Sequence, residues 1–169
     1  MTAIFKREFK AFFATPVGYI VLAAFYLFSG YFFTLFYKMG SPEVHNIIMT
    51  MSIIIVFVTP LLTMRLMSDD RRQKTDQALL TAPVSLYSIV LGKFFAALSV
   101  FALGFVPTIV FEIIVMTHVS VNIMTYVYAL LGILLLGSTL IAIGMFISSL
   151  TESSVVSAIL TLVVNILVL

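Results

Sequence analysis

Charged residues are scarce in this chain, and their scarcity indicates its class. Only 9% of the 169 residues are charged, whereas 62% are hydrophobic. Soluble domains carry about 25% charged residues, so this chain has too few of them to cover a globular surface in water. Lipid must cover that surface instead. The length fits a single membrane domain over residues 1–169.

Several chemistries are excluded by what is missing. The chain has no cysteine, which removes disulfides, thiolate metal sites and cysteine nucleophiles. It has no G-x-x-x-x-G-K-[ST] motif, so it cannot by itself bind and hydrolyse ATP in the P-loop manner. No H-E-x-x-H spacing occurs, His45 and His118 stand alone, and no serine has a base and an acid to activate it. We therefore expect no catalytic residue, no metal site and, without a basic tract interleaved with aromatics, no nucleic-acid partner.

The N-terminal residues 2–14 predict an amphipathic helix. At 100° per residue, phenylalanines cluster on one face and basic residues on the next. This pattern is typical of a helix that lies in the membrane interface, with its cations toward anionic headgroups. The residues expected to anchor it are Phe5, Lys6, Arg7, Phe9, Lys10 and Phe12. The alternative is a short extension of the first span outside the membrane.

Five apolar runs follow this helix. About 20 apolar residues cross a bilayer core, which predicts spans over residues 17–37, 47–64, 86–116, 126–150 and 153–169. Pro60 and Pro107 lie inside the second and third spans and should kink them. The fifth run ends without a charged flank, so we expect the sequence to be a fragment. The predicted fold class is an all-α integral membrane protein, a polytopic helix bundle with an interfacial N-terminal helix.

Basic residues are distributed unevenly between the two sides of these spans. Only Lys38 lies on the side reached by the end of the first span. The other eight of the nine lie before the first span or after the second, on one shared side: Lys6, Arg7, Lys10, Arg65, Arg71, Arg72, Lys74 and Lys93. The positive-inside rule makes that side cytoplasmic, so the N-terminus is predicted to be cytoplasmic as well.

Half of the charged residues lie between residues 65 and 93. Flanked by two spans, this segment must lie in water at the membrane face. Residues 68–83 predict a cytoplasmic helix that has Asp69 and Asp70 in its first turn, where the helix dipole favours acids, and that ends at Pro83. Such a helix is either a solvated connector or a docking site for a soluble partner.

Three polar side chains fall within predicted spans. Lys93 is close enough to the start of the third span to snorkel to the interface. Glu112 lies about 28 Å further along the helix, which favours an interfacial carboxylate near the outer boundary; the alternatives are a place in a translocation path or in helix packing. Asn165 could form hydrogen bonds between helices. No span carries a series of acids or histidines, which argues against a proton pump or an ion-coupled carrier within this chain.

Two stretches carry a resemblance to a known family. The run Asp69-Asp70-Arg71-Arg72, then Thr75, then Leu79-Leu80-Thr81-Ala82-Pro83-Val84-Ser85, then Gly92-Lys93 resembles the ABC-2 family of transporter permeases. The opening, Phe5 to Phe13 followed by Pro16, is similar to that family's interfacial helix. The similarity is strongest to gliding-motility-type permeases, followed by nitrous-oxide-reductase-maturation permeases. Lys74 and Gln77 depart from the family's usual Gly and Glu, and the family has six spans where this chain stops in the fifth.

The resemblance implies a permease subunit in the bacterial inner membrane that exports an unidentified substrate. It would form a homodimer or heterodimer and work with soluble P-loop ATPase subunits, which bind the ATP and Mg that this chain does not. The residues expected to couple to the ATPase are Asp69, Asp70, Arg71, Arg72, Thr75, Gln77, Leu79, Leu80 and Pro83. Pro60 and Pro107 could pass that motion into the spans. Two other functions remain open, a non-transport membrane scaffold and an ATP-independent secondary carrier.

Overall fold

The computed structural model describes residues 2–40, 43–68, 86–118 and 122–168. Within these residues the chain forms helices joined by turns and contains no strand. The helices are α1 (Thr2–Ala14), α2 (Pro16–Lys38), α3 (Val44–Thr63), α6 (Leu86–Leu103), α7 (Val106–Met116), α8 (Ile123–Leu150) and α9 (Ser154–Val168). This result confirms the predicted all-α class.

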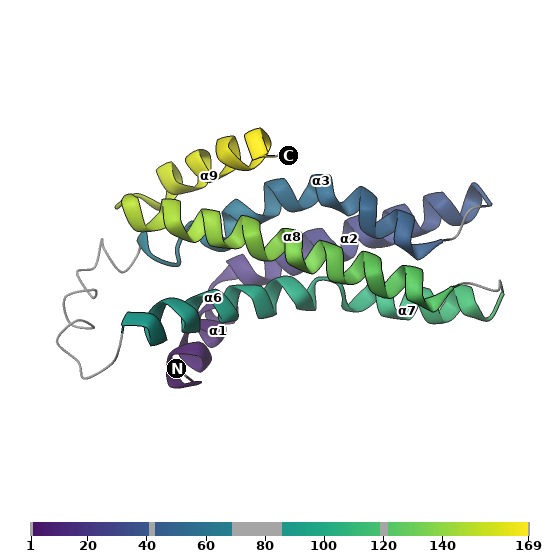
Figure 1. Cartoon of the computed structure of the whole chain (residues 1–169), viewed down its shortest axis with the longest axis horizontal. Coiled ribbons are helices and arrows are strands. Elements are labelled where there is room, and N and C mark those ends of the chain that lie inside the picture. Colours follow the sequence, from purple (N-terminus) through teal and green to yellow (C-terminus); the bar gives the residue numbers. More distant parts are fainter. Residues whose placement is uncertain (1, 41–42, 69–85, 119–121, 169) are drawn as a thin grey trace.

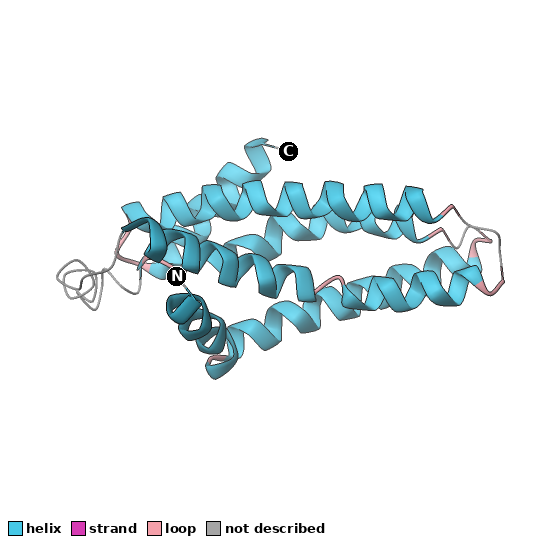
Figure 2. Ribbon diagram, turned by 60° about the horizontal axis from the view of Figure 1, so that its bottom comes forward, coloured by secondary structure: helices cyan, strands magenta, loops and turns pink. Residues whose placement is uncertain are grey.

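Four segments in the described part of the chain are long and apolar enough to cross a membrane. They are Pro16–Lys38, Val44–Thr63, Tyr87–Met116 and Ile123–Leu150. Figure 1 shows them lying lengthwise beside one another, with α1 crossing them at one end. The helix α9 is apolar but shorter; it packs against α3 and α8, and Figure 2 shows it crossing the other helices at an angle.

The two ends of the bundle differ in charge. The helix α1, the end of α3, the start of α6 and the turn between α8 and α9 lie at the same end (Figure 1). We call this the basic end, because it carries Lys6, Arg7, Lys10, Arg65 and Lys93. The links from α2 to α3 and from α7 to α8 lie at the opposite end.

The helix α3 lies at the centre of the bundle. It packs against α2, α7, α8 and α9, and 56% of its most apolar stretch is buried, against 17% for α2. Since lipid is as apolar as leucine, association of such helices depends on close packing and interhelical hydrogen bonds rather than on removal of apolar surface from water. Small residues are therefore expected where helices meet.

Two glycines of α8 allow a direct test of this packing. A methyl group added at Gly137 would lie 2.2 Å from the ring of the fully buried Phe101, whereas one added at Gly132 would meet nothing within 4 Å. We expect Gly137→Ala to lower the free energy of unfolding by about 1–3 kcal/mol through overpacking. Gly132→Ala, the matched control, should raise it by up to about 1 kcal/mol through helix propensity. Equilibrium unfolding in mixed micelles measures both, and equal stabilities would show that the Gly137 contact is not tight.

The third predicted span is broken into two helices. The chain leaves helical geometry at Gly104 and Phe105, and Pro107 then lies in the first turn of α7. Proline fits that position because the first amides of a helix have no intrahelical partner. Pro60 behaves differently: it lies near the end of α3, and the helix continues past it to Thr63.

Candidate functional site

The predicted ATPase-coupling residues lie outside the described residues. These are Asp69, Asp70, Arg71, Arg72, Thr75, Gln77, Leu79, Leu80 and Pro83. The structure does describe the residues on either side of this segment: residues 64–68, which follow α3, and the start of α6 at Leu86. We call residues 64–68 the exit turn.

One side chain of α8 bonds to the exit turn. The hydroxyl of Ser148, which is fully buried, accepts hydrogen bonds from the backbone amides of Met67 (3.2 Å) and Ser68 (3.1 Å). It donates to the backbone carbonyl of Met64 at 3.2 Å. A serine hydroxyl has one donor and two acceptor lone pairs, so these bonds use its whole capacity. Because helix ends leave backbone groups unpaired, Ser148 stabilises the end of α3.

A lysine of α6 bonds to the same turn. The Nζ atom of Lys93 donates to the backbone carbonyl of Leu66 at 2.6 Å and lies 3.3 Å from Oε1 of Glu8 in α1. The Lys93 side chain is only 2% exposed, so the prediction that it snorkels to the interface is wrong. The physical reason is that a carboxylate and a carbonyl inside the protein replace the water and headgroups that a buried ammonium would otherwise need.

The Glu8 carboxylate links two cations of different burial. Nη2 of Arg7 lies 2.6 Å from the same Oε1 atom that faces Lys93. The Glu8 side chain is 13% exposed, whereas that of Arg7 is 53% exposed. The carboxylate therefore lies between the packed interior and the surface, with one cation on each side.

Close packing of α1 against α6 allows this ion pair to form. A methyl group at Gly92 would lie 3.0 Å from Cγ2 of Ile4, closer than nearly all real contacts. Glycine at this position lets the backbone of α1 approach α6, and the next residue, Lys93, then meets Glu8. The Gly92-Lys93 pair of the sequence thus has a local structural explanation.

The predicted interfacial helix is also a packing element. Its aromatic face, Phe5, Phe9 and Phe13, packs against the core, and Phe12 is buried. Its basic side chains, Lys6, Arg7 and Lys10, are exposed. The phenylalanines therefore contact protein, while the cations remain on the surface of the basic end.

Sequence reasoning missed Glu8 and Ser148 as site residues. Glu8 is the single acid among the basic residues of α1, and that contrast was the available signal. For Ser148, the only feature visible in the sequence was that it is a small residue four positions after Gly144. Its bonding partners are backbone atoms 80 to 84 residues away, and such partners leave no trace in the sequence.

At the opposite end of the bundle, Glu112 is 4% exposed. Neither of its carboxylate oxygens has a hydrogen-bond partner among the described residues. The helix α7 therefore turns this side chain into the bundle, as either alternative, a place in a translocation path or in helix packing, would require. Thr108 lies one turn earlier on α7, and its hydroxyl lies 3.2 Å from the hydroxyl of Tyr126 on α8; both are buried.

Asn165 joins two helices. Its Nδ2 atom donates to the hydroxyl of Thr59 at 2.8 Å, which connects α9 to the turn of α3 that contains Pro60. Ser157, Thr161 and Asn165 are buried along one face of α9, at spacings of four residues. Of this face, Asn165 supplies the polar contact to α3, while the hydroxyls of Ser157 and Thr161 are buried without a hydrogen-bond partner among the described residues.

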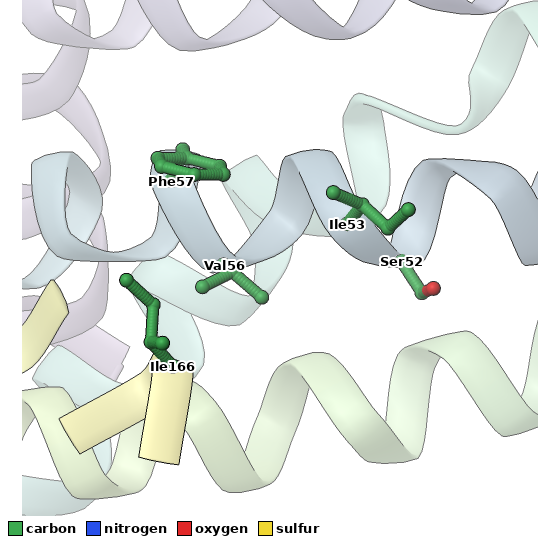
Figure 3. Close-up of a pocket in the computed structure, with 5 residues that line it drawn as sticks. All are labelled: Ser52, Ile53, Val56, Phe57 and Ile166. Carbon is green, nitrogen blue, oxygen red and sulfur yellow. The ribbon is translucent and has the colours of Figure 1, made fainter. Parts of the chain in front are cut away.

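Two further observations limit the chemistry of the described residues. A shallow groove of about 300 Å³ lies between α3 and α9, lined by Ser52, Ile53, Val56, Phe57 and Ile166 (Figure 3). Its lining has one hydroxyl and no charge. No group of three or more His, Cys, Asp or Glu side chains that could hold a metal occurs in the described part of the chain.

Comparison with known proteins gives one match. A family model described as "ABC-2 family transporter protein" matches residues 2–169. No curated protein and no solved structure matches the chain.

Proposed function

Because the chain belongs to the ABC-2 family of transporter proteins, we propose that it is the membrane permease subunit of an ABC exporter whose ATP is hydrolysed by a separate subunit. The observation that carries this proposal is a family match over almost the whole chain, together with helices that can cross a membrane. These 169 residues contain no P-loop motif, so the proposal places the ATPase outside them.

The contact with that ATPase is the segment that follows the exit turn. Acidic and basic residues from Asp69 to Arg72 would orient the two subunits, and Leu79 and Leu80 would supply the buried apolar contact. The described elements on either side of the segment, the end of α3 and the start of α6, lie at the basic end. If this end faces the cytoplasm, as the positive-inside rule predicts, the segment is placed where a soluble ATPase can reach it.

The remaining parts of the proposal rest on family analogy. They are export as the direction, a second permease subunit, ATP and Mg bound by the ATPase, and a bacterial inner-membrane location. Within the family, the gliding-motility and nitrous-oxide-reductase-maturation types are the proposed relatives. Pro60 and Pro107, next to Thr59 and Thr108 in the interior, are the proposed points at which α3 and α7 respond to ATPase movement.

Purification from native membranes in a mild detergent tests the proposal. We expect a stoichiometric P-loop ATPase to copurify, identified by mass, and ATP hydrolysis in the purified complex. Replacing Arg71 and Arg72 together by glutamate should release the ATPase, because like charges would then face its docking surface. Lys38→Glu, a charge reversal at the opposite end, should leave the complex intact. A chain that purifies with non-nucleotide partners would indicate a scaffold, and one that transports without ATP would indicate a secondary carrier.

A further inference from the structure

The exit turn is held by helices that are distant from it in the sequence. Ser148 reaches it from α8, over 80 to 84 residues, and Lys93 reaches it from α6, over 27 residues. Glu8 adds α1 through its ion pair with Lys93. The atoms held are the backbone amides and carbonyls of residues 64–68. Bonds to backbone atoms restrain the path of the chain itself, whatever side chains the turn carries.

The exit turn is also buried where it is held. Leu66 is 3% exposed and Ser68 is fully buried. Within the turn, Ser68 donates its hydroxyl to the carbonyl of Met64, so the two ends of the turn are connected. The turn contains no glycine. A segment with these features moves together with its neighbours and not as a free hinge, since breaking it loose would leave several buried polar groups unpaired.

We propose that Ser148, Lys93 and Glu8 form a clamp that holds the exit turn by two separate connections, or arms. The first arm is Ser148, which bonds the turn to α8; the second is Lys93 with its ion pair to Glu8, which bonds the turn to α6 and α1. Movement of the proposed ATPase-docking segment passes through the first arm to α8 and through the second to α1 and α6. This inference rests on the proposed function, because it requires an ATPase that moves the segment after residue 68. The three side chains are positioning residues: they act through the backbone of the turn.

One arm consists of hydrogen bonds of a hydroxyl group and the other contains an ion pair, so each can be removed by substitutions that leave the other in place. Ser148→Ala removes the α8 arm and leaves its neighbour Ser149 in place. Ser149→Ala is the matched control, because that hydroxyl bonds within its own helix, to the carbonyl of Phe146. The second arm is cut by Glu8→Met together with Lys93→Met. Exchange of a buried ion pair for apolar side chains of similar volume is often neutral or stabilising, so this double variant should fold.

The experiment uses the permease–ATPase complex in liposomes, with ATP and vanadate to trap the nucleotide-bound state. The chain has no native cysteine, so an environment-sensitive fluorophore can be attached at one introduced position. Met124→Cys reports on the far end of α8, and Ala11→Cys reports on α1; both positions are exposed. ATP hydrolysis is measured in the same samples.

We expect a crossed pattern of losses. Ser148→Ala should lose the ATP-dependent signal at residue 124 and keep it at residue 11. The Glu8→Met/Lys93→Met variant should lose the signal at residue 11 and keep it at residue 124. Both should retain the ATPase subunit and its hydrolysis, and Ser149→Ala should keep both signals. A general loss of structure would reduce both signals together, so the crossed pattern separates a positioning role from a structural one.

Three results would overturn the inference. Full signals at both positions in both cut variants would show that the arms carry no movement, while leaving the permease proposal intact. Loss of the ATPase from the cut variants would show that these residues build the docking surface instead. Absence of an ATPase from the wild-type preparation would overturn the proposed function and the clamp together, and it would be visible before any variant is made.

Discussion

Replacing Glu8 by methionine should lower the free energy of unfolding by about 3–5 kcal/mol, because it breaks a buried ion pair by removing the carboxylate beside the Lys93 ammonium. Lys93 is 2% exposed and its Nζ lies 3.3 Å from the Glu8 carboxylate. The hydrogen bond from Lys93 to the Leu66 carbonyl would remain, but the charge-assisted contact with the Glu8 carboxylate would be lost. Unfolding in mixed micelles, followed by helical circular dichroism, measures the loss.

Lys93→Met should cost less, about 1–3 kcal/mol, because Arg7 still pairs with Glu8 and water reaches that carboxylate. The double variant should then be close to the wild type in stability. This non-additivity is the signature of a direct pair, and a double-mutant cycle isolates it. Lys6→Met, at an exposed position of α1, is the control and should change stability by less than about 0.5 kcal/mol. Additive losses in the double variant would show that the two charges stabilise the fold independently.

Replacing the carboxyl group of Glu112 by an apolar side chain should change stability in the opposite direction. The side chain is 4% exposed, and its oxygens have no partner among the described residues. Burial of an unpaired polar group costs about 1–3 kcal/mol, and more when it is charged. We therefore expect Glu112→Met to raise the free energy of unfolding by an amount of about that size. Unfolding in mixed micelles, at a pH where exposed carboxylates are ionised, provides the measurement.

A matched control is available for this prediction. Glu152, in the turn between α8 and α9, is exposed, so Glu152→Met should leave stability unchanged within about 0.5 kcal/mol. If Glu112→Met is more stable while ATP hydrolysis in the purified complex falls, the carboxylate serves transport at the expense of stability, as functional sites often do. A destabilised Glu112→Met variant would instead place Glu112 among the packing residues.

Much of the fold could be predicted from the sequence, because it depends on local properties. The end of α1 and the start of α2 follow from Pro16, which suits the first turn of a helix and interrupts the preceding one. The break before α7 follows from Pro107 in the same way. The membrane-length helices follow from the lengths of the apolar runs. In each case the deciding residues lie inside the element that they define.

The candidate site could be predicted only in part. Gly92 and Lys93 were identified as a motif, but the snorkelling expected of Lys93 depended on its distance from the membrane face alone. That argument overlooked that α1 could fold back and bring Glu8 to it. For Glu112, a count along one helix indicated depth, yet it could not indicate whether the side chain points to lipid or into the bundle.

The sequence alone determined that this protein is an all-α membrane protein, and it predicted that most basic residues lie on one side of the spans, because run length and the order of charges are properties of the chain itself. Only the tertiary structure decided which helices hold the exit turn. Ser148 and Lys93 bind backbone atoms of residues 64–68, and every residue presents the same backbone amide and carbonyl. Such contacts are specified by how helices pack in space, so no pattern of side chains in the turn could have indicated them.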